Sequence, residues 1–257
     1  MPETHRPTAR VVAALRSIAA SGQGLTLSQL ASQTSVAKST LFPIMHTLRD
    51  AGWVVYDEAT QRYRVGPGMY ELGASYLAAH SGLADVKAIM TGIVAACGET
   101  CYFGRLAGDE VSYLLAVDSP QPIRMVASVG NRLPAHSTAI GKALLSRQRP
   151  DQVRRLYPHG LRAMTANTIT NLDVLIQQLD QVRREGLAYE TEESTPHICC
   201  VAVPLIVGIH AVAAVSVATP VFRFTPEKKQ LIVRLLLDAK PKLERIVAAT
   251  PLVDEAG

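Results

Sequence analysis

Residues 25–53 read LTLSQLASQTSVAKSTLFPIMHTLRDAGW, and this stretch predicts most of the N-terminal fold. Thr26 can cap a short helix, because its hydroxyl accepts hydrogen bonds from the free backbone amides of a helix start. After a tight break, Ser35 is expected to cap a second helix that runs to about Ala51 and ends at Gly52. Two short helices joined by a tight break are typical of a helix-turn-helix.

The second helix of this stretch carries one apolar stripe, formed by Leu41, Ile44, Met45 and Leu48 at helical spacing. The other face begins with a lysine and small hydroxyl residues, which can approach DNA closely. In a helix-turn-helix, the second helix presents its N-terminal residues to the major groove. We therefore expect DNA contacts from Lys38, Ser39, Thr40, Phe42 and His46.

The segments on both sides of this stretch complete a winged helix-turn-helix. Upstream, residues 9–20 place apolar side chains at helical spacing. Downstream, two β-rich runs at 53–56 and 61–65 flank a polar turn, which predicts a hairpin. A hairpin directly after the recognition helix is the wing of a winged helix. We assign this DNA-binding domain to residues 1–67.

Basic residues are concentrated in this domain. Residues 1–67 contain seven Lys and Arg residues against four Asp and Glu residues, a charge of +3 out of the chain's net +4. A basic module on a nearly neutral body suits a polyanionic partner. Arg62 and Arg64, in the second strand of the wing, are expected to contact phosphates. The alternative is a small helical domain that mediates only protein contacts.

After Gly66-Pro67-Gly68 the pattern changes to a connecting helix, assigned to residues 68–82, and then to a larger domain at 83–257. The pattern of this domain predicts helices at 83–97, 137–146, 151–157 and 171–185 and from 226 toward 249, with strands at 100–106, 111–118, 123–129, 187–190, 199–206 and 210–218. A loop is expected at 130–134, and Pro241 should kink or split the last helix. Strands mixed with helices out of strict alternation predict an α+β fold.

The composition limits the class of protein. The 257 residues are 48% hydrophobic and 19% charged, which is typical of a globular chain. No apolar run approaches the length of a membrane span, and the first twenty residues contain no secretion signal. We therefore expect a soluble, cytoplasmic protein with no membrane partner and no cofactor. The four cysteines are too few for a secreted disulfide scaffold.

Four stretches in order resemble the IclR family of bacterial transcriptional regulators: LTLSQLASQTSVAKSTLFPIMHTLRDAGWV, YRVGPGMYELGASYL, VGNRLPAHSTAIGKALLS and EGLAYETEESTPHICCVAVPLIVG. The resemblance covers nearly the whole chain. It implies a winged helix joined by a short helix to a GAF-like effector-binding domain. It also implies operator DNA as a partner, bound by a homodimer or a dimer of dimers, and a small organic effector that controls DNA binding.

The resemblance also implies where the effector binds. One wall of the family's pocket lies at the start of the helix in the motif that here reads PAHSTAIGKALL. Free backbone amides at a helix start bind anions such as carboxylates, which gives this position a physical reason. The effector-binding positions carried over from the family are Ala139, Ile140, Glu190, Cys200, Ser216 and Ala218.

Three positions depart from the family pattern. Pro43 replaces an arginine common in relatives, and we expect it to kink or shorten the recognition helix. Glu190 replaces the usual aspartate and is one methylene longer. Ala218 stands where some relatives that bind small keto acids have serine. These changes favour a larger or partly apolar effector, such as an aromatic acid.

Other classes of protein remain as alternatives. A nucleophilic enzyme could use His197 with Cys200, but three positions along a strand place them on opposite faces. The four thiols of Cys97, Cys101, Cys199 and Cys200 do not have zinc-hook spacing, so we expect no metal site. A redox sensor at the two adjacent cysteines and a larger domain that only oligomerises are further options. We expect a regulator, not an enzyme.

Overall fold

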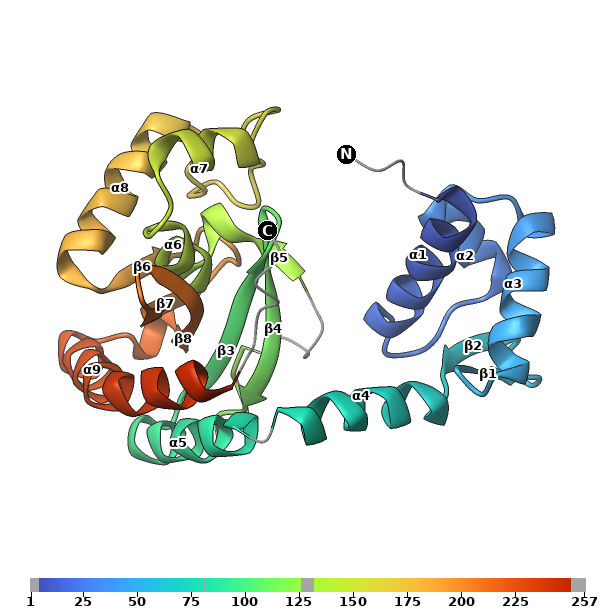
Figure 1. Cartoon of the computed structure of the whole chain (residues 1–257), viewed down its shortest axis with the longest axis horizontal. Coiled ribbons are helices and arrows are strands. Elements are labelled where there is room, and N and C mark those ends of the chain that lie inside the picture. Colours follow the sequence, from blue (N-terminus) through green and yellow to red (C-terminus); the bar gives the residue numbers. More distant parts are fainter. Residues whose placement is uncertain (1–4, 81, 126–131, 251–257) are drawn as a thin grey trace. The chain divides into compact units, whose positions relative to one another are not determined.

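The computed structural model describes residues 5–80, 82–125 and 132–250 (Figure 1). The chain divides into two compact units, Met1–Ala79 and His80–Gly257. The first unit contains helices α1 (Arg6–Ala20), α2 (Leu27–Thr34), α3 (Lys38–Asp50) and α4 (Pro67–Ala79) and strands β1 (Val54–Asp57) and β2 (Arg62–Val65). This is the predicted order of a winged helix-turn-helix followed by a connecting helix.

The start of α2 forms as the sequence predicts, whereas the start of α3 does not. Thr26 and Gln29 form a reciprocal capping box at the start of α2. The prediction that Ser35 caps the next helix is wrong. Ser35 adopts a left-handed conformation (φ 54°) that ends α2, and α3 begins at Lys38 after Ala37, which provides no side-chain cap. The turn between the helices is therefore longer than expected.

Pro43 does not shorten the recognition helix. α3 continues through this proline to Asp50. Proline removes only its own N–H, so the helix loses one backbone hydrogen bond, to the Ser39 carbonyl, and keeps its other bonds. Leu41, Met45 and Leu48 are buried on one side of α3, which confirms the predicted apolar stripe.

The wing is tied to the helices by backbone pairing. β1 and β2 pair antiparallel from Val54 and Val65 to Asp57 and Arg62. Leu25 forms an isolated bridge with Tyr63, with N–O distances of 3.0 Å and 2.8 Å. The hairpin is thus anchored to the turn that precedes α2, and this pairing holds the wing against the helical part of the unit.

The second unit is built around a six-stranded antiparallel sheet with the order β5-β4-β3-β8-β7-β6. Its strands are β3 (Thr100–Ala107), β4 (Glu110–Val117), β5 (Arg132–Pro134), β6 (Ala188–Thr191), β7 (Ile198–Val207) and β8 (His210–Pro220). Its helices are α5 (Gly82–Cys97), α6 (Ala139–Leu145), α7 (Pro150–Leu156), α8 (Leu172–Glu185) and α9 (Pro226–Ala249), with short 3-10 turns at Ala135–Ser137 and Val221–Arg223. The predicted α+β class is confirmed.

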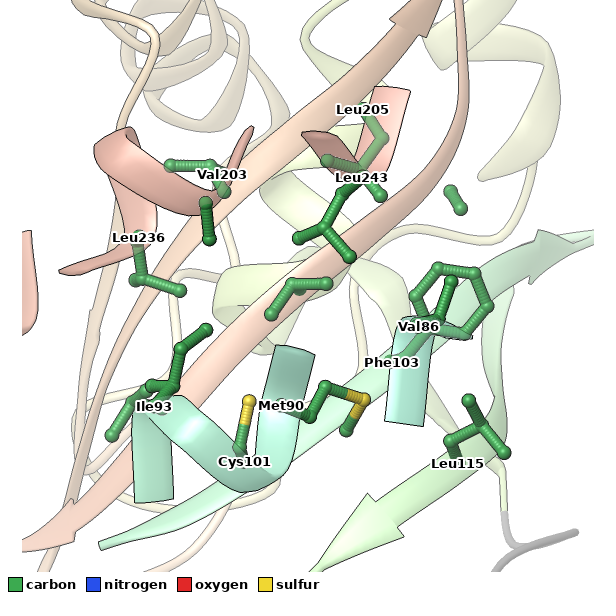
Figure 2. Packing of buried hydrophobic residues seen from close by; sticks show 14 of the residues in the cluster. Val86, Met90, Ile93, Cys101, Phe103, Leu115, Val203, Leu205, Leu236 and Leu243 are labelled. Atoms are coloured by element: carbon green, nitrogen blue, oxygen red, sulfur yellow. The ribbon is translucent and has the colours of Figure 1, made fainter. Parts of the chain in front are cut away.

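Helices cover both faces of this sheet. α5 and α9 pack on one face, where Met90 and Leu243 meet Phe103 and Val203 of the strands (Figure 2). α6, α7 and α8 contribute to the apolar cluster on the other face, which includes Tyr102. Because side chains alternate along a strand, neighbouring residues of β7 and β8 belong to different clusters. The face beneath α6 is therefore separate from the core in Figure 2.

Two predictions about the strands of this unit are wrong. Residues 132–134 were expected in a loop but form β5, because they pair with Glu110–Ser112 of β4. Of the strand predicted at 123–129, residues 123–125 are not in a strand and the others lie outside the described residues.

α9 is one 24-residue helix that continues through Pro241 and is not split. Its predicted start is confirmed, since the Thr225 hydroxyl accepts a hydrogen bond from Lys228 N–H at 3.2 Å.

Candidate functional site

The outer face of α3 presents a set of exposed side chains. Lys38 and Ser39 occupy the first turn, and Phe42 follows with 58% of its surface exposed. Thr40 is half-buried, and His46 is exposed one turn further along. A protruding aromatic side chain beside a lysine and hydroxyl groups can contact base edges and phosphates.

His46 does not extend freely from this face. Its Nδ1 atom lies 2.9 Å from the carboxylate of Asp50, one turn later in α3. Arg49 lies beside the same carboxylate at 3.9 Å. This contact places the ring of His46 beside the acidic side chain of Asp50 on the exposed face of α3.

The two arginines of the wing differ in their freedom. Arg62 donates through Nη1 to the Gly24 carbonyl at 2.7 Å and to Gln29 at 3.3 Å. These bonds tie the wing to the start of α2 and engage one side of the guanidinium. Arg64 is exposed and forms a loose ion pair with Asp57 at 3.6 Å. Of these two arginines, Arg64 is the one better placed to reach a phosphate.

In the second unit, strand pairing aligns the predicted effector residues in two neighbouring rows. Glu190 pairs with Cys200, and Cys200 pairs with Ala218. Two positions along on the same face, Ser216 pairs with Tyr102. Residues that pair directly, or that stand two apart on one strand, point to the same face of a sheet. All four predicted strand positions therefore face α6.

α6 covers this face with its first residues. Ala139 and Ile140, the first two residues of the helix, are buried in the same cluster as Ala218. Thr138 caps the helix through the Gly141 amide at 3.0 Å. A Cβ atom at Gly141 would lie 2.0 Å from the Ala135 carbonyl oxygen, so only glycine permits this close approach.

Glu190 is the most unusual group on the face, because only 1% of its surface is exposed. Burial raises its pKa and outweighs the hydrogen bonds that the carboxyl group accepts from Ser194, Cys200 and Glu193. The pKa of the adjacent Cys200 thiol is raised well above its ordinary value, first by burial and then by Glu190. This thiol is therefore not a thiolate nucleophile at neutral pH.

Four further residues belong to this region, although sequence reasoning gave none of them a role. Tyr102 and Tyr113 pack edge to face with ring centres 5.3 Å apart. Burial raises the pKa of Tyr113, followed by the effects of Cys200 and Tyr102. Lys142 of α6 forms a buried ion pair with Glu193. The alternation of residues in β3 and β4 could have indicated the tyrosines, but nothing local indicates the partner of Lys142.

The geometry does not support a cysteine-histidine enzyme. His197 precedes β7 in a left-handed conformation (φ 65°), its side chain is 88% exposed, and it lies 3.6 Å from Glu192. Cys200 faces the opposite way, into the cluster beneath α6. Cys97 and Cys101 lie in the other core, so the four thiols are divided between the two faces. The described part of the chain contains no group of three or more His, Cys, Asp or Glu residues that could hold a metal ion.

Comparison with known proteins identifies both units. Residues 7–58 match the IclR helix-turn-helix domain, and residues 74–245 match the bacterial transcriptional regulator IclR C-terminal domain. The transcriptional regulator KdgR of Escherichia coli is 30% identical over 221 residues, which are 84% of this chain and 83% of KdgR. Relatives of this kind are named transcriptional regulators, not enzymes.

Solved structures agree with this assignment. The IclR transcriptional regulator of Alicyclobacillus acidocaldarius superposes with a TM-score of 0.85 at 26% identity, over 95% of this chain and 99% of that one. An IclR homologue from Microbacterium hydrocarbonoxydans, complexed with 4-hydroxybenzoate, shares the fold with a TM-score of 0.76 at 19% identity, over 93% of this chain and 99% of that one. In the described residues, no helix is both long and apolar enough to cross a membrane. The chain belongs to the IclR family of DNA-binding bacterial transcriptional regulators.

Proposed function

We propose that a small organic acid binds beneath α6 of this regulator and changes its affinity for operator DNA. The observation that carries the proposal is the buried carboxyl group of Glu190, whose Oε2 atom has no hydrogen-bond partner of normal geometry among the described residues. Buried polar atoms are rarely left unpaired in folded proteins, so such an atom on a largely apolar face is suited to a ligand.

The effector is held by six residues from four elements. α6 contributes backbone amides at its start, and the strands contribute a carboxyl, a thiol and a hydroxyl group. The proposed contacts are Ala139, Ile140, Glu190, Cys200, Ser216 and Ala218. Their common orientation toward one sheet face supports this set, although the strand residues come from distant parts of the sequence.

An aromatic acid suits this face best. Tyr102 and Tyr113 supply ring surfaces beside Ser216, and Ala218 contributes only a methyl group, which leaves more room for a ring than a serine side chain. Aromatic side chains bind flat apolar rings through offset or edge-to-face contacts. The structural neighbour that was crystallised with 4-hydroxybenzoate makes this compound the first member of a sensible panel.

DNA is bound by the unit that contains α3 and the wing. The proposed DNA contacts are Lys38, Ser39, Thr40, Phe42, His46, Arg62 and Arg64. The exposed first turns of α3 support the base contacts, and Arg64 supports a phosphate contact. Arg62 acts through its remaining N–H groups, since one side of it holds the Gly24 carbonyl.

The regulator acts as a homodimer or a dimer of dimers, so that two DNA-binding domains occupy paired half-sites. We assign residues 1–67 to DNA binding, 68–82 to the linker and 83–257 to effector binding. The effector must bind the DNA-competent and DNA-free forms with different affinity, because otherwise it cannot shift the equilibrium between these two forms. α4 is the covalent connection through which this difference acts. The bacterial cytoplasm, which holds the chromosome, is the proposed site of action.

A thermal-shift screen against aliphatic and aromatic acids tests the effector. An acid that binds only the folded state, at about one hundred times its dissociation constant, stabilises it by about 2.7 kcal/mol. Glu190→Ala should abolish the shift, whereas the matched surface variant Glu110→Ala should retain it, since Glu110 forms a partly exposed ion pair with Arg132. Operator fragments selected from a random DNA library then report, by fluorescence anisotropy, whether the acid changes DNA affinity.

The outcomes separate this proposal from its rival. An acid that stabilises the protein and alters DNA affinity supports effector control. No stabilisation by any acid, together with unaltered DNA binding, would instead indicate a larger domain that only oligomerises.

A further inference from the structure

The two oxygens of the Glu190 carboxyl group have different environments. Oε1 accepts hydrogen bonds from the backbone N–H groups of Glu193 at 2.7 Å and Ser194 at 3.0 Å, and from the Ser194 hydroxyl at 3.3 Å. Oε2 is buried and has no partner of normal hydrogen-bond geometry among the described residues, although the Cys200 thiol lies beside the carboxyl group. One oxygen thus has several donors, and the other is buried on the face beneath α6 without a hydrogen bond of normal geometry.

Among the described residues, no cation forms an ion pair that would compensate a negative charge on Glu190. The titratable groups that face it are the Cys200 thiol from β7, the Tyr113 hydroxyl from β4 and the carboxylate of Glu193 from the β6–β7 turn. The ammonium group of Lys142 donates to both oxygens of Glu193 at 2.5 Å and 2.7 Å. Lys142 therefore neutralises Glu193, and no described residue forms an ion pair with Glu190.

These contacts determine where a proton would lie. An ionised carboxylate buried without a cation is strongly disfavoured, and the neutral acid avoids that cost. Oε1 already accepts three hydrogen bonds, so the proton belongs on Oε2, the oxygen without a partner. The neutral Glu190 then presents an O–H donor, rather than a negative charge, to the face beneath α6.

We infer that protonated Glu190 donates a hydrogen bond through Oε2 to the carboxylate of an anionic effector. This inference rests on the proposed effector function and specifies the chemistry of the same site. It explains how a site built around an acidic residue accepts an organic anion without like-charge repulsion. The proton stays on the hydrogen bond between Oε2 of Glu190 and a carboxylate oxygen of the effector. No covalent bond of the effector is formed or broken. Bonds of the O–H···O⁻ type are short and strong.

The inference has a distinctive consequence for pH dependence. Only the protonated form of Glu190 binds the anion, so affinity is constant between the pKa of the effector and the pKa of Glu190, and it falls about tenfold per pH unit once Glu190 ionises. A carboxylate that accepted a hydrogen bond from an effector hydroxyl would show the opposite trend, with binding strengthened as Glu190 ionises. The direction of the pH dependence therefore distinguishes the two arrangements.

Infrared spectroscopy of the full-length protein tests the protonation state without any ligand. The difference spectrum between wild type and Glu190→Gln at neutral pH should contain the C=O stretch of a carboxylic acid. That band should convert to carboxylate bands when the wild-type sample is titrated upward. Glu110→Gln, on the surface, should show only carboxylate bands in the same comparison. Carboxylate bands alone in the Glu190 difference spectrum would overturn the inference.

Calorimetric titration with 4-hydroxybenzoate tests the hydrogen bond itself. Glu190→Leu should lose binding at every pH, because it has no donor. Glu190→Gln should restore binding and make it independent of pH above the pKa of the effector, because its amide N–H replaces the acid O–H and cannot ionise. Failure of Glu190→Gln to restore the affinity would overturn the inference, while the wild-type protein would still support effector binding. Absence of binding by the wild type to every acid tested would refute the effector function and this role of Glu190 with it.

Discussion

Replacing Lys142 with methionine should destabilise the second unit more than any surface change. Lys142 is 1% exposed, and its Nζ atom donates to both oxygens of Glu193 and to the Tyr189 carbonyl at 3.3 Å. Methionine has a similar length and keeps the packing volume of the lysine stem. The substitution therefore removes the positive charge and three hydrogen bonds, and leaves the buried Glu193 carboxylate without a cation.

The magnitude follows from this geometry. Removing one partner of a buried ion pair costs about 3–5 kcal/mol, because the remaining charge stays desolvated. The side chain of Glu193 is only 10% exposed, so water can recover little of that cost. For a domain of this size each kcal/mol lowers the melting temperature by about 2–4 °C. We therefore expect a loss of about 6–20 °C in the transition of the second unit.

Differential scanning calorimetry of the full chain measures this loss. Arg155→Met is the matched control, since Arg155 and Asp151 form an exposed pair one helical turn apart, and we expect it to change stability little. The double variant Lys142→Met with Glu193→Leu should recover most of the loss, because it removes both charges together. A loss below about 1 kcal/mol for Lys142→Met would place the pair among weak surface ion pairs and refute the reasoning. If this variant does not fold, Glu193→Gln tests the same ion pair by removing its negative charge instead of its positive charge.

Three further variants test other parts of the molecule. Lys38→Ala should weaken binding to all DNA sequences and reduce the salt dependence of binding by about one counterion, and an unchanged salt slope in anisotropy titrations would contradict the phosphate contact. Burial lowers the pKa of His136, so the stability that its neutral ring contributes is complete above about pH 6.5 and is lost as the pH falls toward its folded value. His136→Gln should flatten that part of the stability profile in calorimetry, and an unchanged slope would exclude this role. Leu243→Ala should cost about 2–5 kcal/mol in chemical denaturation by opening the core in Figure 2, whereas the same change at partly exposed Leu237 should cost much less.

The helix-turn-helix could be predicted from the sequence because its signals are local. The stripe of Leu41, Met45 and Leu48 lies within one helix, and the capping box of Thr26 joins residues three apart. The start of α3 could not be predicted in this way. Ser35 is a good cap residue by type, but here it adopts the left-handed conformation that ends the preceding helix. Ser35 is suited by type either to cap α3 or to end α2, and the packing of the two helices decides which of these it does.

The residues beneath α6 show more clearly what could not be predicted from the sequence. The family resemblance supplied Glu190, Cys200, Ser216 and Ala218, and no pattern along the chain places them together. Pairing between β6, β7, β8 and β3 aligns them on one face, because antiparallel register joins residues that are distant in sequence. The two tyrosines join this face for the same reason.

The sequence by itself determined the order of most elements, the apolar face of most helices, the basic N-terminal domain and the family. Each of these follows from spacing, composition or motifs within short stretches of chain. Only the tertiary structure decided that Lys142 neutralises Glu193, 51 residues away, and that Glu190 is buried with several donors on one oxygen and no partner of normal geometry on the other. Burial and register are properties of the packed chain, and they determine the charge state of a carboxyl group.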